Sequence, residues 1–111
     1  MHLRVYYLIN RSGECVSSTS AIEMTPRQIR EQLLDRLQSE DDYLGLLDAE
    51  GRVLQILPEP AQARFYVEVP LDAAKASYGC YMTRDELNEL ILNLPTEFTE
   101  TSIPGLTYKP W

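Results

Sequence analysis

Alternation of apolar and polar residues is the feature that most constrains the fold of this chain. Residues 3–9 place an apolar side chain at every second position, and residues 63–69 repeat the pattern. In the second stretch Phe65, Val67 and Val69 alternate with Arg64, Tyr66 and Glu68. A period of two in residues of this type predicts strands with one face on a core and the other toward water or a partner.

Two short turns of similar chemistry follow predicted strands. Asn10–Gly13 predicts a type I turn with a glycine bulge, leading into a second strand over residues 14–21. Serine and threonine dominate the end of that stretch, which is typical of a sheet edge. Asp48–Gly51 repeats the turn chemistry. A three-stranded meander is predicted over residues 43–47, 52–57 and 63–69.

Two capping boxes predict helix starts. Thr25 with Gln28, and Thr83 with Glu86, have the spacing at which each side chain bonds the other residue's backbone N–H. Apolar stripes at helical spacing follow both: Ile29, Leu33, Leu34 and Leu37 in the first, and Leu87, Leu90, Ile91 and Leu94 in the second. Residues 78–82 predict a further short strand before the second helix.

These elements predict a single α+β domain over residues 1–111. We expect a mainly antiparallel sheet of about five strands, with the two helices packed on one face. The crossover through the first helix allows one parallel pair within that sheet. Residues 96–111, rich in threonine and proline, are expected to form an extended tail packed on the domain.

Charge and composition limit the classes of partner. The net charge is −7, from 17 acidic and 10 basic residues, which argues against nucleic-acid binding and favours a basic protein partner. We expect no membrane contact, since no apolar run approaches the ~20 residues of a membrane helix. Two cysteines far apart, Cys15 and Cys80, and a start without a signal peptide predict a cytoplasmic location.

The side chains used most often in catalysis are scarce. His2, next to the N-terminus, is the only histidine, so a Ser-His or Cys-His nucleophile pair is not expected. The spacing of the cysteines does not fit a zinc site, and the five glycines form no phosphate-binding loop. The sequence therefore predicts a non-enzymatic protein with no cofactor and no metal.

One acidic stretch keeps an enzymatic alternative open. Its members are Glu40, Asp41, Asp42, Asp48 and Glu50. Carboxylates close in sequence can bind a divalent cation or serve as acid and base, so a small metal-dependent enzyme is the alternative. A third hypothesis is a self-associating subunit that pairs through an exposed strand edge, for example as a homodimer.

Tyrosine is the most distinctive component, with seven tyrosines and two phenylalanines. Tyrosine is enriched at protein interfaces, where one end of the side chain is apolar and the other is wet. Together with the acidic stretch it predicts the partner-binding residues. They are Tyr66, Glu68, Asp41, Asp42, Asp48 and Glu50.

The order of elements resembles that of bacterial polymorphic-toxin immunity proteins. The features that carry the likeness are an early helix, a meander with the Asp48–Gly51 turn, a later helix and the terminal Trp111. The opening hairpin over residues 3–20 departs from that pattern. The resemblance implies a cytosolic inhibitor that binds and blocks a cognate toxin domain.

Overall fold

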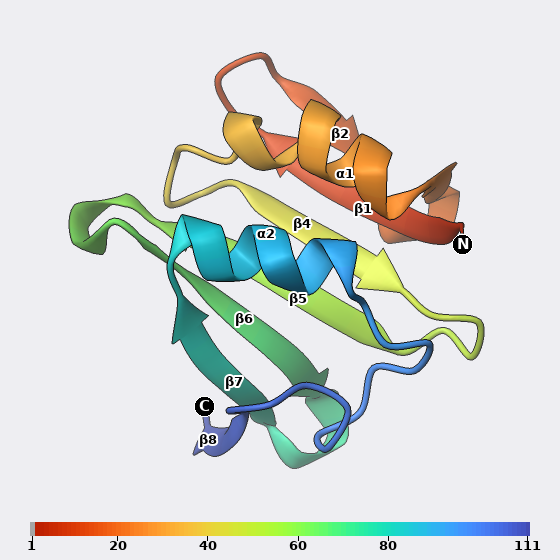
Figure 1. Ribbon diagram of the computed structural model, residues 1–111, viewed down its shortest axis with the longest axis vertical. Coiled ribbons are helices and arrows are strands. Elements are labelled where there is room, and N and C mark those ends of the chain that lie inside the picture. The colour runs from red at the N-terminus through yellow and green to blue at the C-terminus, as the bar shows by residue number, and fades with distance from the viewer. Residues whose placement is uncertain (1) are drawn as a thin grey trace.

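The computed structural model describes residues 2–111 and confirms an α+β architecture with an antiparallel sheet (Figure 1). Within this part of the chain the strands are β1 (Leu3–Ile9), β2 (Glu14–Val16), β3 (Ile22–Met24), β4 (Tyr43–Leu47), β5 (Val53–Glu59), β6 (Arg64–Leu71), β7 (Ala76–Met82) and β8 (Thr107–Pro110). The helices are α1 (Pro26–Gln32) and α2 (Arg84–Leu92). The sheet thus has eight strands, and the prediction of about five was wrong.

The first reason for the larger number of strands lies at the sheet edge formed by residues 14–24. The predicted strand over residues 14–21 is two strands, β2 and β3, and both pair with β1. Val16 lies opposite Tyr7 and Ile22 opposite Val5, so the residues between them leave the ladder and form a short 3₁₀ turn, η1 (Ser18–Ser20). Three residues are too few to show alternation, which is why β3 was missed.

The second reason lies at the other edge. β7 is a full strand paired with both β6 and β8, and the predicted tail supplies β8. Gly79 and Cys80 interrupt the apolar pattern of β7, and Pro104, Gly105 and Pro110 around β8 disfavour a strand in isolation. Pairing with β7 overrides that local preference.

Local signals near turns and helix starts were confirmed. Both capping boxes form: Thr25 accepts from Gln28 N at 3.2 Å, and Thr83 accepts from Glu86 N at 3.2 Å. In the two predicted turns Gly13 and Gly51 have φ of 76° and 80°, the left-handed region that glycine enters at little cost. These signals act over three or four residues, so the rest of the fold does not change them.

The sheet order is β1-β4-β5-β6-β7-β8. β2 and β3 both pair with the outer edge of β1, β2 along residues 7–9 and β3 along residues 3–5. All seven pairings are antiparallel, so the parallel pair that the sequence allowed does not form. The reason is that α1 carries the chain from β3 to β4, and these two strands flank β1.

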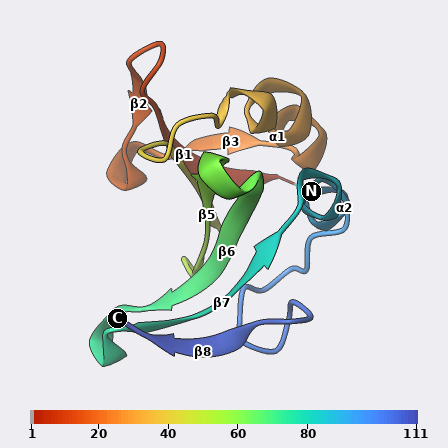
Figure 2. The same cartoon turned by 90° about the vertical axis from the view of Figure 1, so that its left-hand side faces the viewer.

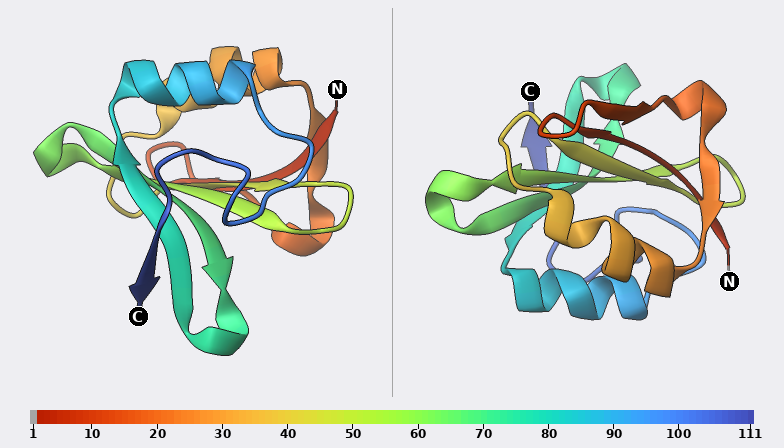
Figure 3. Two further views of the ribbon diagram at one scale, coloured as in Figure 1. Left: turned by 60° about the horizontal axis from the view of Figure 1, so that its bottom comes forward. Right: turned by 90° about the horizontal axis from the view of Figure 1, so that it is seen from above.

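Both helices cover one face of the sheet, as expected (Figure 3). The core lies between the helices and the sheet. It includes Val5, Ile29, Leu44, Ile56, Val67, Leu87 and Ile91, each fully or nearly fully buried. Residues 93–106 extend this cover and bury Phe98 and Ile103. We call the opposite side of the sheet the open face. There β6, β7 and β8 turn away from the plane of β1 and β5 (Figure 2).

Candidate functional site

Asp42, one of the predicted partner-binding residues, is buried just before β4 and is 1% exposed. Its carboxylate accepts four hydrogen bonds, from the backbone and side-chain amides of Asn10 and from the backbone N–H groups of Gln38 and Ser39, at 2.9–3.0 Å. Burial alone would raise the pKa of Asp42, but these donors outweigh it and lower the pKa. The carboxylate ties the end of β1 to the approach of β4, and it does not face solvent.

Asp48 has the same kind of role at the other end of β4 and is 3% exposed. Its oxygens accept from the backbone N–H groups of Glu50, Arg52 and Phe98 and from Arg52 Nε, at 2.8–2.9 Å. Burial favours a higher pKa, yet the donors on Phe98, Arg52 and Glu50 together lower the pKa of Asp48. This side chain therefore fastens the β4–β5 turn to the C-terminal segment.

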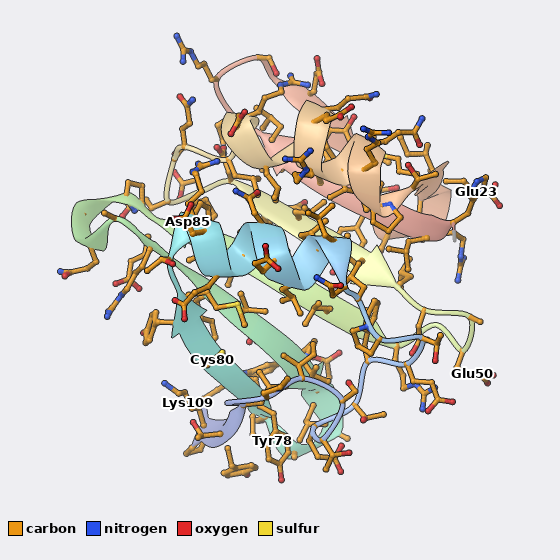
Figure 4. The ribbon with its side chains drawn as sticks, in the orientation of Figure 1. Glu23, Glu50, Tyr78, Cys80, Asp85 and Lys109 are labelled. Atoms are coloured by element: carbon orange, nitrogen blue, oxygen red, sulfur yellow. The ribbon has the colours of Figure 1, made fainter. Side chains whose placement is uncertain are left out.

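Asp41 and Glu50 are exposed and lie at opposite ends of β4. Figure 4 shows Glu50 at the tip of the β4–β5 turn, far from Lys109. The strand thus divides the acidic stretch into two parts. No group of three or more His, Cys, Asp or Glu side chains within residues 2–111 is placed to hold a metal ion. The alternative of a metal-dependent enzyme depended on these carboxylates meeting, and the structure separates them.

Two tyrosine rings lie on the open face, each over a glycine. Tyr6 of β1 covers Gly45 of β4, and Tyr66 of β6 covers Gly79 of β7. A Cβ atom at either glycine would overlap the ring, so a larger residue there would have to displace the tyrosine. The rings cover the backbone of the sheet where no helix does.

A row of polar groups runs beside these rings from β1 to β7. Tyr6 Oη donates to Gln55 Oε1 at 3.0 Å, and Gln55 Nε2 lies 3.4 Å from Glu68 Oε2. The hydroxyls of Tyr66 and Ser77 lie 3.1 Å apart at the other end. This row joins four strands and has a single carboxylate, that of Glu68, near its centre.

Glu68 is 7% exposed and forms no ion pair with any residue in the range 2–111. Burial raises the pKa of its carboxyl; a hydrogen bond from Ser77 partly offsets this, and the charge of Asp72 raises the pKa further. A buried carboxylate that is served only by neutral donors retains an electrostatic cost that a cation would remove.

Glu68 lies at a hollow of about 410 Å³ on the open face. We call it the aromatic hollow and define it by Leu57, Tyr66, Glu68, Tyr81, Lys109 and Trp111. Lys109 Nζ lies 5.5 Å from the Tyr66 ring centroid and 4.9 Å from that of Tyr81. The guanidinium of Arg64 lies 3.7 Å from the Tyr81 centroid. Trp111 is 66% exposed at the rim.

A second hollow of about 350 Å³ lies near Leu37, Phe65 and Arg84. Its wall is largely apolar, and Arg84 is paired with Asp35 at 2.7 Å, as Arg64 is with Glu59 at 2.8 Å. Because these charges are already matched within the chain, this hollow has less chemistry to offer a ligand than the aromatic hollow.

The structure thus places the six predicted residues in three settings. Tyr66 and Glu68 meet in the aromatic hollow, Asp42 and Asp48 are buried in hydrogen bonds, and Asp41 and Glu50 are exposed at either end of β4. The sequence did not predict Gln55, Ser77, Tyr81 or Lys109. Alternation along β7 was the available signal for Ser77 and Tyr81, since both lie on the face that opposes Cys80.

Both edges of the sheet have features that limit strand pairing. β2 and β3 have three residues each and are separated by η1. At the other edge, the backbone N–H of Trp111 donates to Lys75 O at 2.8 Å, on the side of β7. Backbone groups alternate in direction along a strand, so those of Tyr108 and Pro110 point away from β7. Because proline has no N–H, the outer edge of β8 has few donors for another strand.

No protein-family model, no curated protein and no solved structure matches the chain. Within residues 2–111, neither helix has the length and apolar character needed to cross a bilayer. Evidence for a function therefore comes from the chemistry of the aromatic hollow.

Proposed function

We propose that this chain is a non-enzymatic binding domain that docks a basic protein partner on its open face. The observation that carries the proposal is Glu68, a carboxylate that is 7% exposed and without an ion pair in residues 2–111, set among tyrosines in the aromatic hollow. Binding energy at protein interfaces concentrates in such places, where aromatic anchors and a desolvated charge meet.

The charge of the chain supports the same partner. A net charge of −7 produces a negative field that speeds association with a basic protein and weakens as salt is added. Asp41 and Glu50 contribute to that field from opposite ends of β4 without touching the aromatic hollow. Asp42 and Asp48 are left out of the contact surface, since backbone amides already occupy their oxygens.

The specific form we favour is a cytoplasmic immunity protein that binds and blocks a cognate toxin. Its support is the resemblance in element order, the acidic composition and the scarcity of catalytic side chains. A toxin domain that acts on nucleic acid or on another anionic substrate has a basic surface, which an acidic inhibitor would cover.

The test is co-purification and calorimetric titration with the protein encoded by the neighbouring gene. We expect binding that weakens with salt, and a loss of about tenfold or more in affinity for Glu68→Gln and for Tyr66→Ala. Glu23→Gln is the matched control, because Glu23 is exposed and lies at the far corner of the molecule from Lys109 (Figure 4).

Each result has a distinct meaning. A complex that forms with equal affinity in all three variants would place the interface elsewhere on the molecule. If the neighbouring protein does not bind at low salt, the immunity form of the proposal fails.

A further inference from the structure

We infer that the aromatic hollow is a receptor for one arginine side chain of the partner, and that Lys109 is an internal cation competing for the same aromatic surface. The inference rests on the proposed function for its partner, a basic protein. It adds the identity of the recognised group and a residue of this chain that limits affinity.

The carboxylate of Glu68 is the first reason for a cation. Its neighbours are the amide of Gln55, at 3.4 Å, and the hydroxyl of Ser77. Glu59, on the adjacent strand, is instead paired with Arg64 through two nitrogens at 2.8 and 2.9 Å. Glu59 and Glu68 both line this hollow, and Glu68 is the more buried of the two. Glu68 is nevertheless the one that has only neutral donors.

The tyrosine rings are the reason for arginine in particular. The Arg64 guanidinium already lies 3.7 Å from the Tyr81 centroid while it pairs with Glu59. This is the combination of carboxylate, guanidinium and tyrosine that we propose for Glu68 and Tyr66. A planar guanidinium can stack on a ring and still direct its N–H groups at a carboxylate, whereas an ammonium is a compact, strongly hydrated charge.

Lys109 shows that the aromatic surface attracts a cation. Its Nζ lies within 5.5 Å of both ring centroids, yet it makes no ion pair with Glu68. It comes from β8, which pairs with β7 on one side only. An incoming arginine must displace this ammonium from Tyr66, so Lys109 lowers the affinity.

The size of the hollow fits one side chain. About 410 Å³ lies toward the lower end of the range for ligand pockets, about 300–1,000 Å³. The rim residue Trp111 is exposed and can close over the stem of a long side chain. A folded segment of the partner would rest on the rim, with its arginine inserted.

The experiment is an NMR titration of the full chain with L-argininamide, following the ring signals of Tyr66, Tyr81 and Trp111. We expect saturable shifts with a dissociation constant of about a few millimolar, as for a single weak contact. L-citrullinamide, which has nearly the same shape and the same α-amino group but a neutral urea in place of the guanidinium, should not produce them. L-lysinamide should bind about threefold or more weakly than L-argininamide.

Three variants complete the test. Glu68→Gln should weaken L-argininamide binding about fivefold or more, Lys109→Gln should strengthen it about two- to threefold, and Glu23→Gln should leave it unchanged. Glu68→Gln keeps the shape of the side chain and can still bond Gln55, so it is expected to fold.

The inference is overturned if L-argininamide fails to shift these rings, if L-citrullinamide or L-lysinamide binds as well, or if Lys109→Gln weakens binding. Each of these outcomes is separate from the proposed function. A partner complex that is sensitive to Glu68→Gln would stand even when free L-argininamide does not bind. Conversely, L-argininamide could bind to a chain whose neighbouring protein does not.

Discussion

Asp48 and Glu68 are both buried carboxylates, but their surroundings are opposite. Asp48 is 3% exposed and accepts hydrogen bonds from three backbone N–H groups and a guanidinium. Glu68 is 7% exposed and meets neutral side chains on the open face. The pKa of Asp48 is lowered, and the pKa of Glu68 is raised.

Burial alone does not give a carboxylate its role. Desolvation acts on both in the same direction, and the supply of donors decides the outcome. Where backbone amides provide the donors, as at Asp42 and Asp48, the charge stabilises the fold and is hidden from partners. Where they do not, as at Glu68, the charge is held at a cost to the fold and remains able to attract a cation.

The largest effect is expected for Asp48→Asn. The amide presents an NH₂ group where an oxygen accepted a backbone N–H, so buried donors lose their partners at about 1–3 kcal/mol each. We expect the free energy of unfolding to fall by about 3 kcal/mol, measured by urea denaturation followed by circular dichroism.

Glu50→Gln is the matched control for that variant, because Glu50 is exposed in the same turn. It should change the free energy of unfolding by about 0.5 kcal/mol or less. Equal effects of the two substitutions would contradict the contrast drawn between buried and exposed acids.

The second effect is a stability maximum in acid. Asp42 and Asp48 have lowered pKa values, so their contribution is complete above the ordinary aspartate pKa of about 3.9 and is lost as the pH falls through the lowered values. Glu68 has a raised pKa, so stability increases as the pH falls from above that value toward the ordinary glutamate pKa of about 4.3.

The free energy of unfolding should therefore rise from neutral pH toward mild acid and then fall steeply below about pH 4. Urea titrations at a series of pH values measure it. A curve in which Asp48→Asn keeps the full acid loss would contradict the assignment, and so would a wild-type curve without the mild-acid rise.

The smallest effect is expected for Glu68→Gln at neutral pH. Removing an unpaired charge should increase the free energy of unfolding by about 0.5–1 kcal/mol, a modest gain because solvent at the hollow screens the charge. The gain should shrink as the pH falls through the raised pKa of Glu68, because protonation removes the charge in the wild type as well. A loss of stability at neutral pH would show that Glu68, like Asp48, has a structural role.

The elements near strong local signals were predictable. Alternation identified β1 and β6, and the capping boxes of Thr25 and Thr83 identified the starts of both helices. β3 and β8 were not predictable, because three or four residues carry too little pattern and both depend on a partner strand. For the site, Tyr66 and Glu68 were predicted together, whereas Lys109 was hidden in the tail.

Residues that are neighbours along the chain fix which side of each alternating strand faces the core and where the chain turns, so both could be predicted from the sequence. Folding brings together the backbone donors around Asp42 and Asp48, and it leaves Glu68 among neutral side chains. Asn10 reaches Asp42, Phe98 reaches Asp48 and Gln55 reaches Glu68 only after folding brings these segments together. The pKa of a buried carboxyl depends on its hydrogen-bond donors, and part of the donor set comes from distant segments of the chain.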